Sequence, residues 1–106
     1  MVNIAVDPFF MATFTVYLLY SPTIDKFYIG YTSNIEQRLH FHNDSDKNKI
    51  WTKRGQPWEV FFTIQGLHKS QALKIEKYIK RMKSKKHIQE LPNNPKSVEE
   101  LKVKFR

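Results

Sequence analysis

The chain has 106 residues, and its 18 lysines and arginines against 10 aspartates and glutamates give a formal net charge of +8. This length fits one domain with a single core, and the absence of cysteine excludes disulfides and thiolate metal sites. So large a positive charge on a small domain favours a polyanionic partner, nucleic acid above all, over a cationic surface that only confers solubility.

The first twelve residues follow no sustained pattern, and we expect residues 1–12 to form a poorly ordered extension. They contain Asp7 and Pro8 without a basic stretch, so we expect no signal peptide. The longest apolar run, Phe14 to Tyr20, is far shorter than the roughly 20 residues that cross a bilayer. These features predict a cytoplasmic protein without membrane association.

The next segments predict a β-hairpin. Residues 13–20 are rich in β-branched and aromatic side chains, residues 21–25 carry turn-forming Ser, Pro and Asp, and residues 26–31 resume the strand pattern. Alternation along the first strand places Thr15, Tyr17 and Leu19 on one face and Val16, Leu18 and Tyr20 on the other. In the second strand, Tyr28 and Gly30 lie on the face opposite to Phe27 and Ile29.

A short helix is predicted after the hairpin. Ser33 and Glu36 have the spacing of a capping box, which predicts a helix that begins there and runs to about Asn43. Arg38 and His42 are one helical turn apart, so their side chains are expected on the same side of this helix.

A third strand and two further helices follow a polar loop at residues 44–49. Residues 58–64 predict a strand that ends before Gln65 and Gly66, and residues 71–87 predict one long helix capped by Ser70. Glu76 falls at the border of the apolar stripe of this helix, and a short terminal helix is predicted from Ser97 to about residue 105. The apolar stripe consists of Ala72, Ile75, Ile79 and Met82.

The predicted fold class is a small α/β domain. The order β-β-α-β-α with a C-terminal helix predicts a three-stranded mixed or antiparallel sheet, beginning with a hairpin and flanked by helices. We expect the domain to span residues 13–90, with a tail or short helix at residues 91–106. These patterns alone indicate a basic nucleic-acid-binding domain, and the signature of ferredoxin-like RNA-binding domains is absent.

The two tyrosine-bearing strands extend this interpretation. Thr15-Val-Tyr17 and Tyr28-Ile-Gly30, with eleven residues from tyrosine to tyrosine, resemble the two-part signature of the GIY-YIG endonuclease family, although Thr15 stands where the family has glycine. Further matching residues follow in the family's order: Arg38, His42-Asn43, Trp58 at the start of a strand, and Glu76 in a helix. The chain is most similar to single-domain proteins related to the catalytic module of structure-specific and repair nucleases.

The resemblance implies metal-dependent hydrolysis of DNA phosphodiesters. Glu76 resembles the acidic residue that holds one divalent cation, Mg²⁺ or Mn²⁺, and Arg38 resembles the arginine that contacts the scissile phosphate. Tyr17 and Tyr28 resemble the pair of which one orients or deprotonates the attacking water, which for a phenol requires a nearby cation. His42 resembles a residue that reaches the same phosphate, and it is a candidate proton relay.

The expected substrate is branched, flapped or single-stranded DNA in repair or recombination, because backbone contacts read charge and shape rather than base sequence. A non-catalytic nucleic-acid-binding module on the same fold is the alternative, and each residue singly has an ordinary structural explanation. DNA versus RNA, the oligomeric state and the need for a protein partner stay open. The expected phosphate-binding residues are Lys53, Arg54, Lys74, Lys77, Lys80, Arg81, Lys85 and Lys86.

Overall fold

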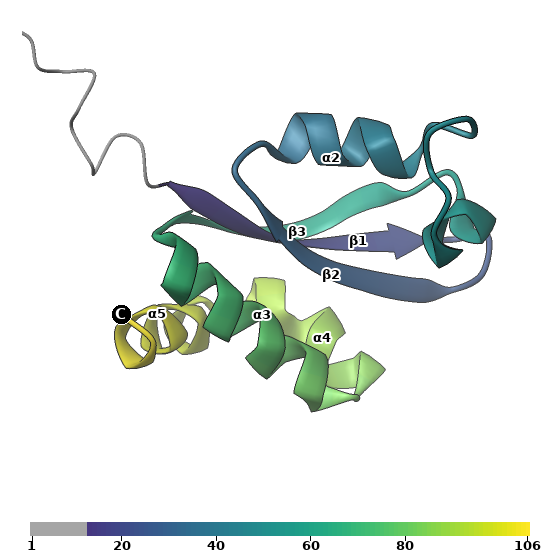
Figure 1. Cartoon of the computed structure of the whole chain (residues 1–106). Coiled ribbons are helices and arrows are strands. Elements are labelled where there is room, and N and C mark those ends of the chain that lie inside the picture. Colours follow the sequence, from purple (N-terminus) through teal and green to yellow (C-terminus); the bar gives the residue numbers. More distant parts are fainter. Residues whose placement is uncertain (1–12) are drawn as a thin grey trace, which may run out of the picture.

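A computed structural model describes residues 13–106 (Figure 1). The poorly ordered extension predicted at residues 1–12 therefore lies outside the described residues. The elements in chain order are β1 (Phe14–Ser21), β2 (Lys26–Thr32), α2 (Ile35–His42), the 3₁₀ helix η2 (Trp51–Gly55), β3 (Glu59–Leu67), α3 (Lys69–Met82), α4 (Lys85–Glu90), the 3₁₀ helix η3 (Leu91–Asn93) and α5 (Pro95–Lys104).

The three strands form one antiparallel sheet in the order β2-β1-β3, which confirms the α/β prediction and decides between the mixed and antiparallel alternatives. The strand β3 runs to Leu67, so the predicted end before Gln65 and Gly66 is wrong. Leu67 pairs with Phe14 across a register shift and is buried, while Gly66 takes up the irregularity with a positive φ of 74°.

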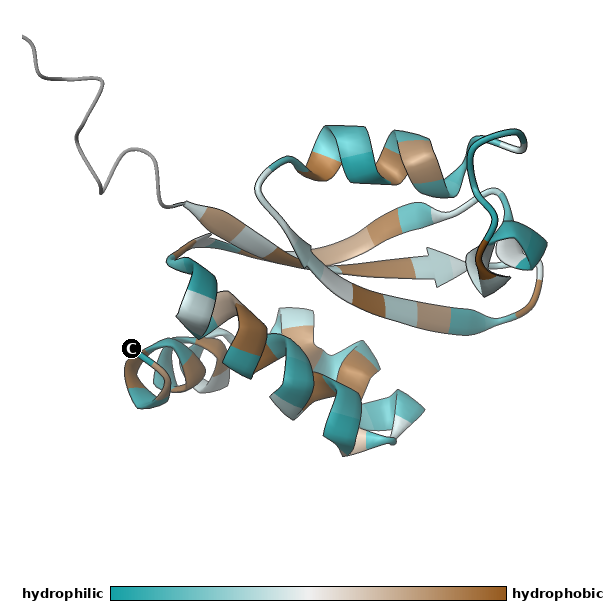
Figure 2. Cartoon of the chain, viewed as in Figure 1, coloured by the Kyte–Doolittle hydropathy of each residue, from teal (hydrophilic) through white to brown (hydrophobic). Residues whose placement is uncertain are grey.

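The two faces of the sheet carry different clusters, as the alternation predicts. Val16 and Leu18 belong to the larger apolar core, together with Ile75 and Ile79 of α3. Tyr17 and Leu19 face the other way and form a smaller cluster with Trp58, against which residues of α2 pack. Helix α2 thus covers one face, and α3, α4 and α5 lie on the other (Figure 1), with hydrophobic segments alternating with hydrophilic ones along the helices (Figure 2).

The helix caps differ from the predicted ones. Asn34, not Ser33, caps α2, and its side chain accepts a hydrogen bond from the Gln37 amide at 3.0 Å. Helix α3 begins two residues earlier than predicted because His68, not Ser70, forms a capping box with Gln71. The Asn34 amide oxygen and the His68 imidazole nitrogen accept hydrogen bonds from backbone amides, as the expected serine hydroxyls would. The helices therefore form in the predicted regions but start at other residues.

The predicted long helix over residues 71–87 is divided into two. Lys83 adopts a left-handed conformation (φ 48°, ψ 19°) that ends α3, and the Ser84 side chain then caps α4 by accepting from the His87 amide at 3.3 Å. The predicted terminal helix is present as α5 and begins earlier, at Pro95. None of the helices within residues 13–106 has the length and apolar character needed to span a membrane.

The backbone of Lys83 generates a stability prediction. Lys83→Gly removes the steric cost of a side chain in the left-handed region, so we expect the free energy of unfolding to rise by about 1 kcal/mol in urea denaturation. The control Lys77→Gly makes the same change at an exposed position inside α3 and should lower stability by about 1 kcal/mol. Destabilisation by both variants would contradict the left-handed helix end.

Candidate active site

The Tyr17 side chain lies across the backbone of the edge strand β2. Tyr17 pairs with Gly30 in the β1–β2 register, and a Cβ atom added at Gly30 would lie only 2.6 Å from the Tyr17 hydroxyl oxygen. Glycine is therefore the residue that leaves room for the phenol. Tyr17 is 1% exposed, so this close contact also covers its ring.

The Tyr17 hydroxyl is held by a fully buried histidine. His42, at the last turn of α2, places Nε2 3.3 Å from the Tyr17 hydroxyl and Nδ1 2.9 Å from the hydroxyl of Thr52 in η2. Two imidazole tautomers satisfy these contacts, and the one with Nε2 unprotonated lets Tyr17 donate its proton to the ring. Because His42 has no exposed surface, it can act on a substrate only through Tyr17.

Two buried residues that the sequence analysis missed complete this network. The Asn48 amide nitrogen donates to the Thr52 hydroxyl and to the His42 carbonyl, each at 2.9 Å, and both Asn48 and Thr52 are fully buried. They come from the polar segment after α2, where no periodicity separates a buried asparagine from an exposed one. Only the presence of a buried histidine, which needs partners, could have pointed to them.

Aromatic rings surround the hydrogen-bonded pair. The half-buried ring of Tyr28 lies 4.6 Å from the His42 ring and 6.1 Å from the Tyr17 ring, measured between centroids. Trp58 lies 6.4 Å from Tyr28 and is itself 2% exposed. Of the two tyrosines, Tyr28 is the one that solvent reaches.

Arg38 contributes positive charge to the same cluster. Burial raises the pKa of Tyr17 to about 12, and the neighbouring Arg38 guanidinium opposes this rise without overcoming it. Burial, with a further contribution from Arg38, lowers the pKa of His42 to about 4. At neutral pH the structure therefore holds a protonated Tyr17 beside a neutral His42.

Glu76 comes from a different layer of the fold than this cluster (Figure 1). It belongs to α3, on the opposite face of the sheet, and within residues 13–106 no hydrogen bond joins it to Tyr17, Tyr28 or Arg38. Its side chain is 11% exposed and forms an ion pair with Lys80 at 3.5 Å. The structure thus brings together four of the five predicted catalytic residues, Tyr17, Tyr28, Arg38 and His42.

Comparison with known proteins decides the family. The family model of the GIY-YIG catalytic domain matches residues 13–89. The chain belongs to the GIY-YIG family. This confirms the resemblance seen in the sequence, and the GIY-YIG domain is a domain of nucleases, which generally use a divalent metal ion.

Three curated relatives support the assignment. The chain is 32% identical to the UPF0213 protein YazA of Bacillus subtilis over 70% of its own length and 77% of that protein. It is 36% identical to a second UPF0213 protein, from Oceanobacillus iheyensis, over 52% of this chain and 63% of the relative. An uncharacterized protein of Acanthamoeba polyphaga mimivirus is 33% identical over 76% of this chain and 51% of its own. No solved structure gives a significant match.

The donor set of this GIY-YIG domain fits one hard divalent cation at Glu76. Mg²⁺ retains several water ligands and is commonly bound through one or two carboxylates. Glu76 presents a mostly covered carboxylate that pairs with the exposed Lys80. Within residues 13–106 no group of three or more His, Asp or Glu side chains forms a cage for a metal.

The predicted phosphate-binding side chains are all exposed, but two are already paired. Lys80 pairs with Glu76, and Lys85 of α4 pairs with the carboxylate and carbonyl of Asp25 in the β1–β2 turn. Lys53 and Arg54 lie in η2, and α3 and α4 carry the other six cations. The Lys85–Asp25 pair places the start of α4 at the hairpin turn, whose Ile24 lines a pocket with Arg54.

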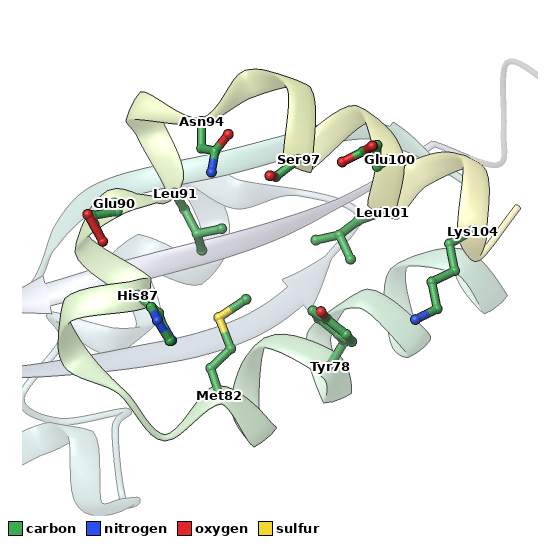
Figure 3. A pocket seen from close by; sticks show the side chains of 10 residues that line it. All are labelled: Tyr78, Met82, His87, Glu90, Leu91, Asn94, Ser97, Glu100, Leu101 and Lys104. Atoms are coloured by element: carbon green, nitrogen blue, oxygen red, sulfur yellow. The ribbon is translucent and has the colours of Figure 1, made fainter.

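A separate pocket lies among α3, α4 and α5. It has a volume of about 340 Å³, and Tyr78, Met82 and Leu101 point into it (Figure 3). None of the predicted catalytic or phosphate-binding residues lines it.

Because His42 is buried and its pKa is lowered, the free energy of unfolding should depend on pH. The unfolded chain binds a proton at His42 near pH 6.5 and the folded chain only near pH 4, so stability is full above pH 6.5 and falls as the pH drops through this window. We expect wild type to lose about 2 kcal/mol more than His42→Gln between pH 7 and pH 4.5 in urea denaturation. His40→Gln, which removes an exposed histidine, should titrate like wild type.

The contact between Tyr17 and Gly30 generates a second prediction. Gly30→Ala should lower the free energy of unfolding by about 1–3 kcal/mol, because a methyl group cannot fit under the phenol. The cost should shrink in a Tyr17→Leu background, which removes the obstructing ring. Thermal or urea unfolding of the two single variants and the double variant measures this coupling, and additive losses would contradict it.

Proposed function

We propose that this protein is a divalent-metal-dependent endonuclease that hydrolyses DNA phosphodiester bonds and selects its substrate by structure, in repair or recombination. The observation that carries the proposal is the cluster of Tyr17, His42, Tyr28 and Arg38 in one small site. In this cluster the neutral His42 imidazole contacts the Tyr17 hydroxyl beside the Arg38 guanidinium, an arrangement suited to proton transfer and phosphate binding. Membership of a nuclease family supports the same interpretation.

Arg38 and Tyr28 are assigned to the side of the site that meets the substrate. Both are partly exposed, so a phosphate and a water molecule can approach them. The planar guanidinium of Arg38 can bind two phosphate oxygens and neutralise their charge. The Tyr28 hydroxyl is assigned to orient the attacking water, because Tyr17 is nearly inaccessible.

Tyr17 and His42 are assigned to proton transfer behind this surface. Neutral His42 accepts the hydrogen bond of the Tyr17 hydroxyl at Nε2, and because Tyr17 is nearly covered, a proton from the attacking water reaches this pair through Tyr28. In this tautomer His42 Nδ1 donates to the Thr52 hydroxyl, which also accepts from the Asn48 amide, and these bonds hold the imidazole in place. A pKa of about 12 means that Tyr17 gives up its proton only when additional positive charge approaches.

Glu76 is assigned to hold the cation, Mg²⁺ or Mn²⁺. When bound, such an ion supplies a Lewis acid that polarises the phosphoryl group and stabilises the leaving oxygen. Glu76 must give up its ion pair with Lys80 for this role, which is a small cost because Lys80 is half exposed.

The substrate path is assigned to the edge of the sheet. β2 is an edge strand, the tyrosine cluster lies on one face of it, and α3 packs against β1 and β2 from the other. A DNA strand along β2 could contact groups of both faces, with Lys53 and Arg54 on one side and the lysines of α3 on the other. Such contacts bind phosphates and shape.

Glu76→Gln tests the proposal. We expect metal-dependent cutting of a labelled panel of single-stranded, duplex, flap and four-way-junction DNA by wild type, and loss of cutting in Glu76→Gln with binding unchanged or tighter, because a negative charge facing phosphate is removed. The control Glu99→Gln removes an exposed, ion-paired glutamate of α5 and should cut normally.

Two results would contradict the proposed endonuclease activity. Cutting that survives in Glu76→Gln would remove Glu76 from the reaction. DNA binding without cutting by wild type in either Mg²⁺ or Mn²⁺ would favour the non-catalytic binding module.

A further inference from the structure

Trp51 is a large aromatic side chain left exposed beside the candidate active site. It is 43% exposed, although tryptophan is on average highly buried. Its ring centroid lies 5.9 Å from that of Tyr28 and 5.8 Å from that of Trp58. The indole is thus supported by two rings of the site cluster while much of its surface faces solvent.

Trp51 also lines a pocket whose charged walls are both cationic. The pocket has a volume of about 370 Å³ and is lined by Ile24, Lys26, Trp51 and Arg54. Lys26 begins the edge strand β2, and Arg54 lies in the same 3₁₀ helix as Trp51. An aromatic surface flanked by two cations matches a nucleotide, whose base is flat and apolar and whose phosphate is anionic.

The pocket is held in shape by hydrogen bonds on its inner side. The Ser21 hydroxyl donates to the Gly55 carbonyl at 2.6 Å, and the indole nitrogen of Trp58 donates to the Thr52 carbonyl at 2.5 Å. The first bond ties the end of η2 to β1 and the second ties its start to the residue before β3, and together they position Trp51 before any ligand binds. A preorganised aromatic side chain loses little conformational entropy on binding.

We propose that Trp51 stacks on one unpaired base next to the scissile phosphate, while Arg54 and Lys26 bind the adjoining phosphates. The inference rests on the proposed nuclease function and specifies its substrate: DNA with an unpaired nucleotide at the cutting position. A base inside a duplex is stacked on both faces and cannot also stack on Trp51, whereas an unpaired base presents a free face.

The test is DNA binding in EDTA, which prevents cutting, with a labelled single strand, its duplex, and the same duplex with a central unpaired bubble. We expect Trp51→Leu to weaken binding to the single strand and the bubble by about fivefold to 150-fold and to leave duplex binding unchanged. Trp51→Phe should retain most of the affinity. Tyr78→Leu, which removes an exposed aromatic residue of α3, should have no effect.

Fluorescence provides a readout that a loss of packing would not mimic. The chain has two tryptophans, so Trp51→Phe leaves the buried Trp58 as the only one. We expect single-stranded DNA to quench the fluorescence of wild type and not that of the folded Trp51→Phe variant. Circular dichroism checks that each variant is folded.

The outcomes separate this proposal from the proposed function. Wild-type binding to all three DNAs that is unchanged in Trp51→Leu, or reduced equally on all three, overturns the stacking role and leaves the nuclease proposal standing. Quenching that persists in Trp51→Phe also overturns it. A wild-type protein that binds none of the DNAs in EDTA overturns the stacking proposal, and one that also cuts none of them in Mg²⁺ or Mn²⁺ overturns both proposals.

Discussion

The hydrogen bonds that join Tyr17, His42 and Thr52 connect three separate parts of the chain, namely β1, α2 and η2. Each of these groups is buried, and loss of the His42 ring would remove a hydrogen-bond partner from both Tyr17 and Thr52. The segment between α2 and β3 has little regular structure, and it takes its shape from these bonds together with those of Asn48. The same bonds position the phenol that the candidate site depends on.

Burial decides the protonation states in this cluster more than charge does. Arg38 acts on both Tyr17 and His42, but the loss of solvent around each group has the larger effect on its pKa. At neutral pH the cluster therefore carries the positive charge of Arg38, while Tyr17 and His42 are both neutral. Tyr17 and His42 are thus still neutral when a phosphate or a bound metal ion approaches with the substrate. Proton transfer between them can therefore be coupled to the arrival of the substrate.

Much of the fold and part of the site were predictable from the sequence. Alternation in β1 and β2 gave the two faces, and the apolar stripe from Ala72 to Met82 gave the contact face of α3. The division at Lys83 was not predictable, because lysine is no marker of a left-handed residue. Asn48 and Thr52 were missed because they matter through the hydrogen bonds around His42. No periodic pattern in the sequence links these residues to His42. The placement of Glu76 on the other face required the three-dimensional structure.

The contact between Tyr17 and Gly30 has an evolutionary consequence. The hydroxyl of one residue occupies the space in which the other would carry its Cβ atom. Position 30 therefore cannot take a larger residue while Tyr17 is kept: a larger residue there requires a smaller one at position 17. Across relatives that share this sheet, the glycine in the second half of the motif is expected to be replaced only where the first tyrosine has also been replaced.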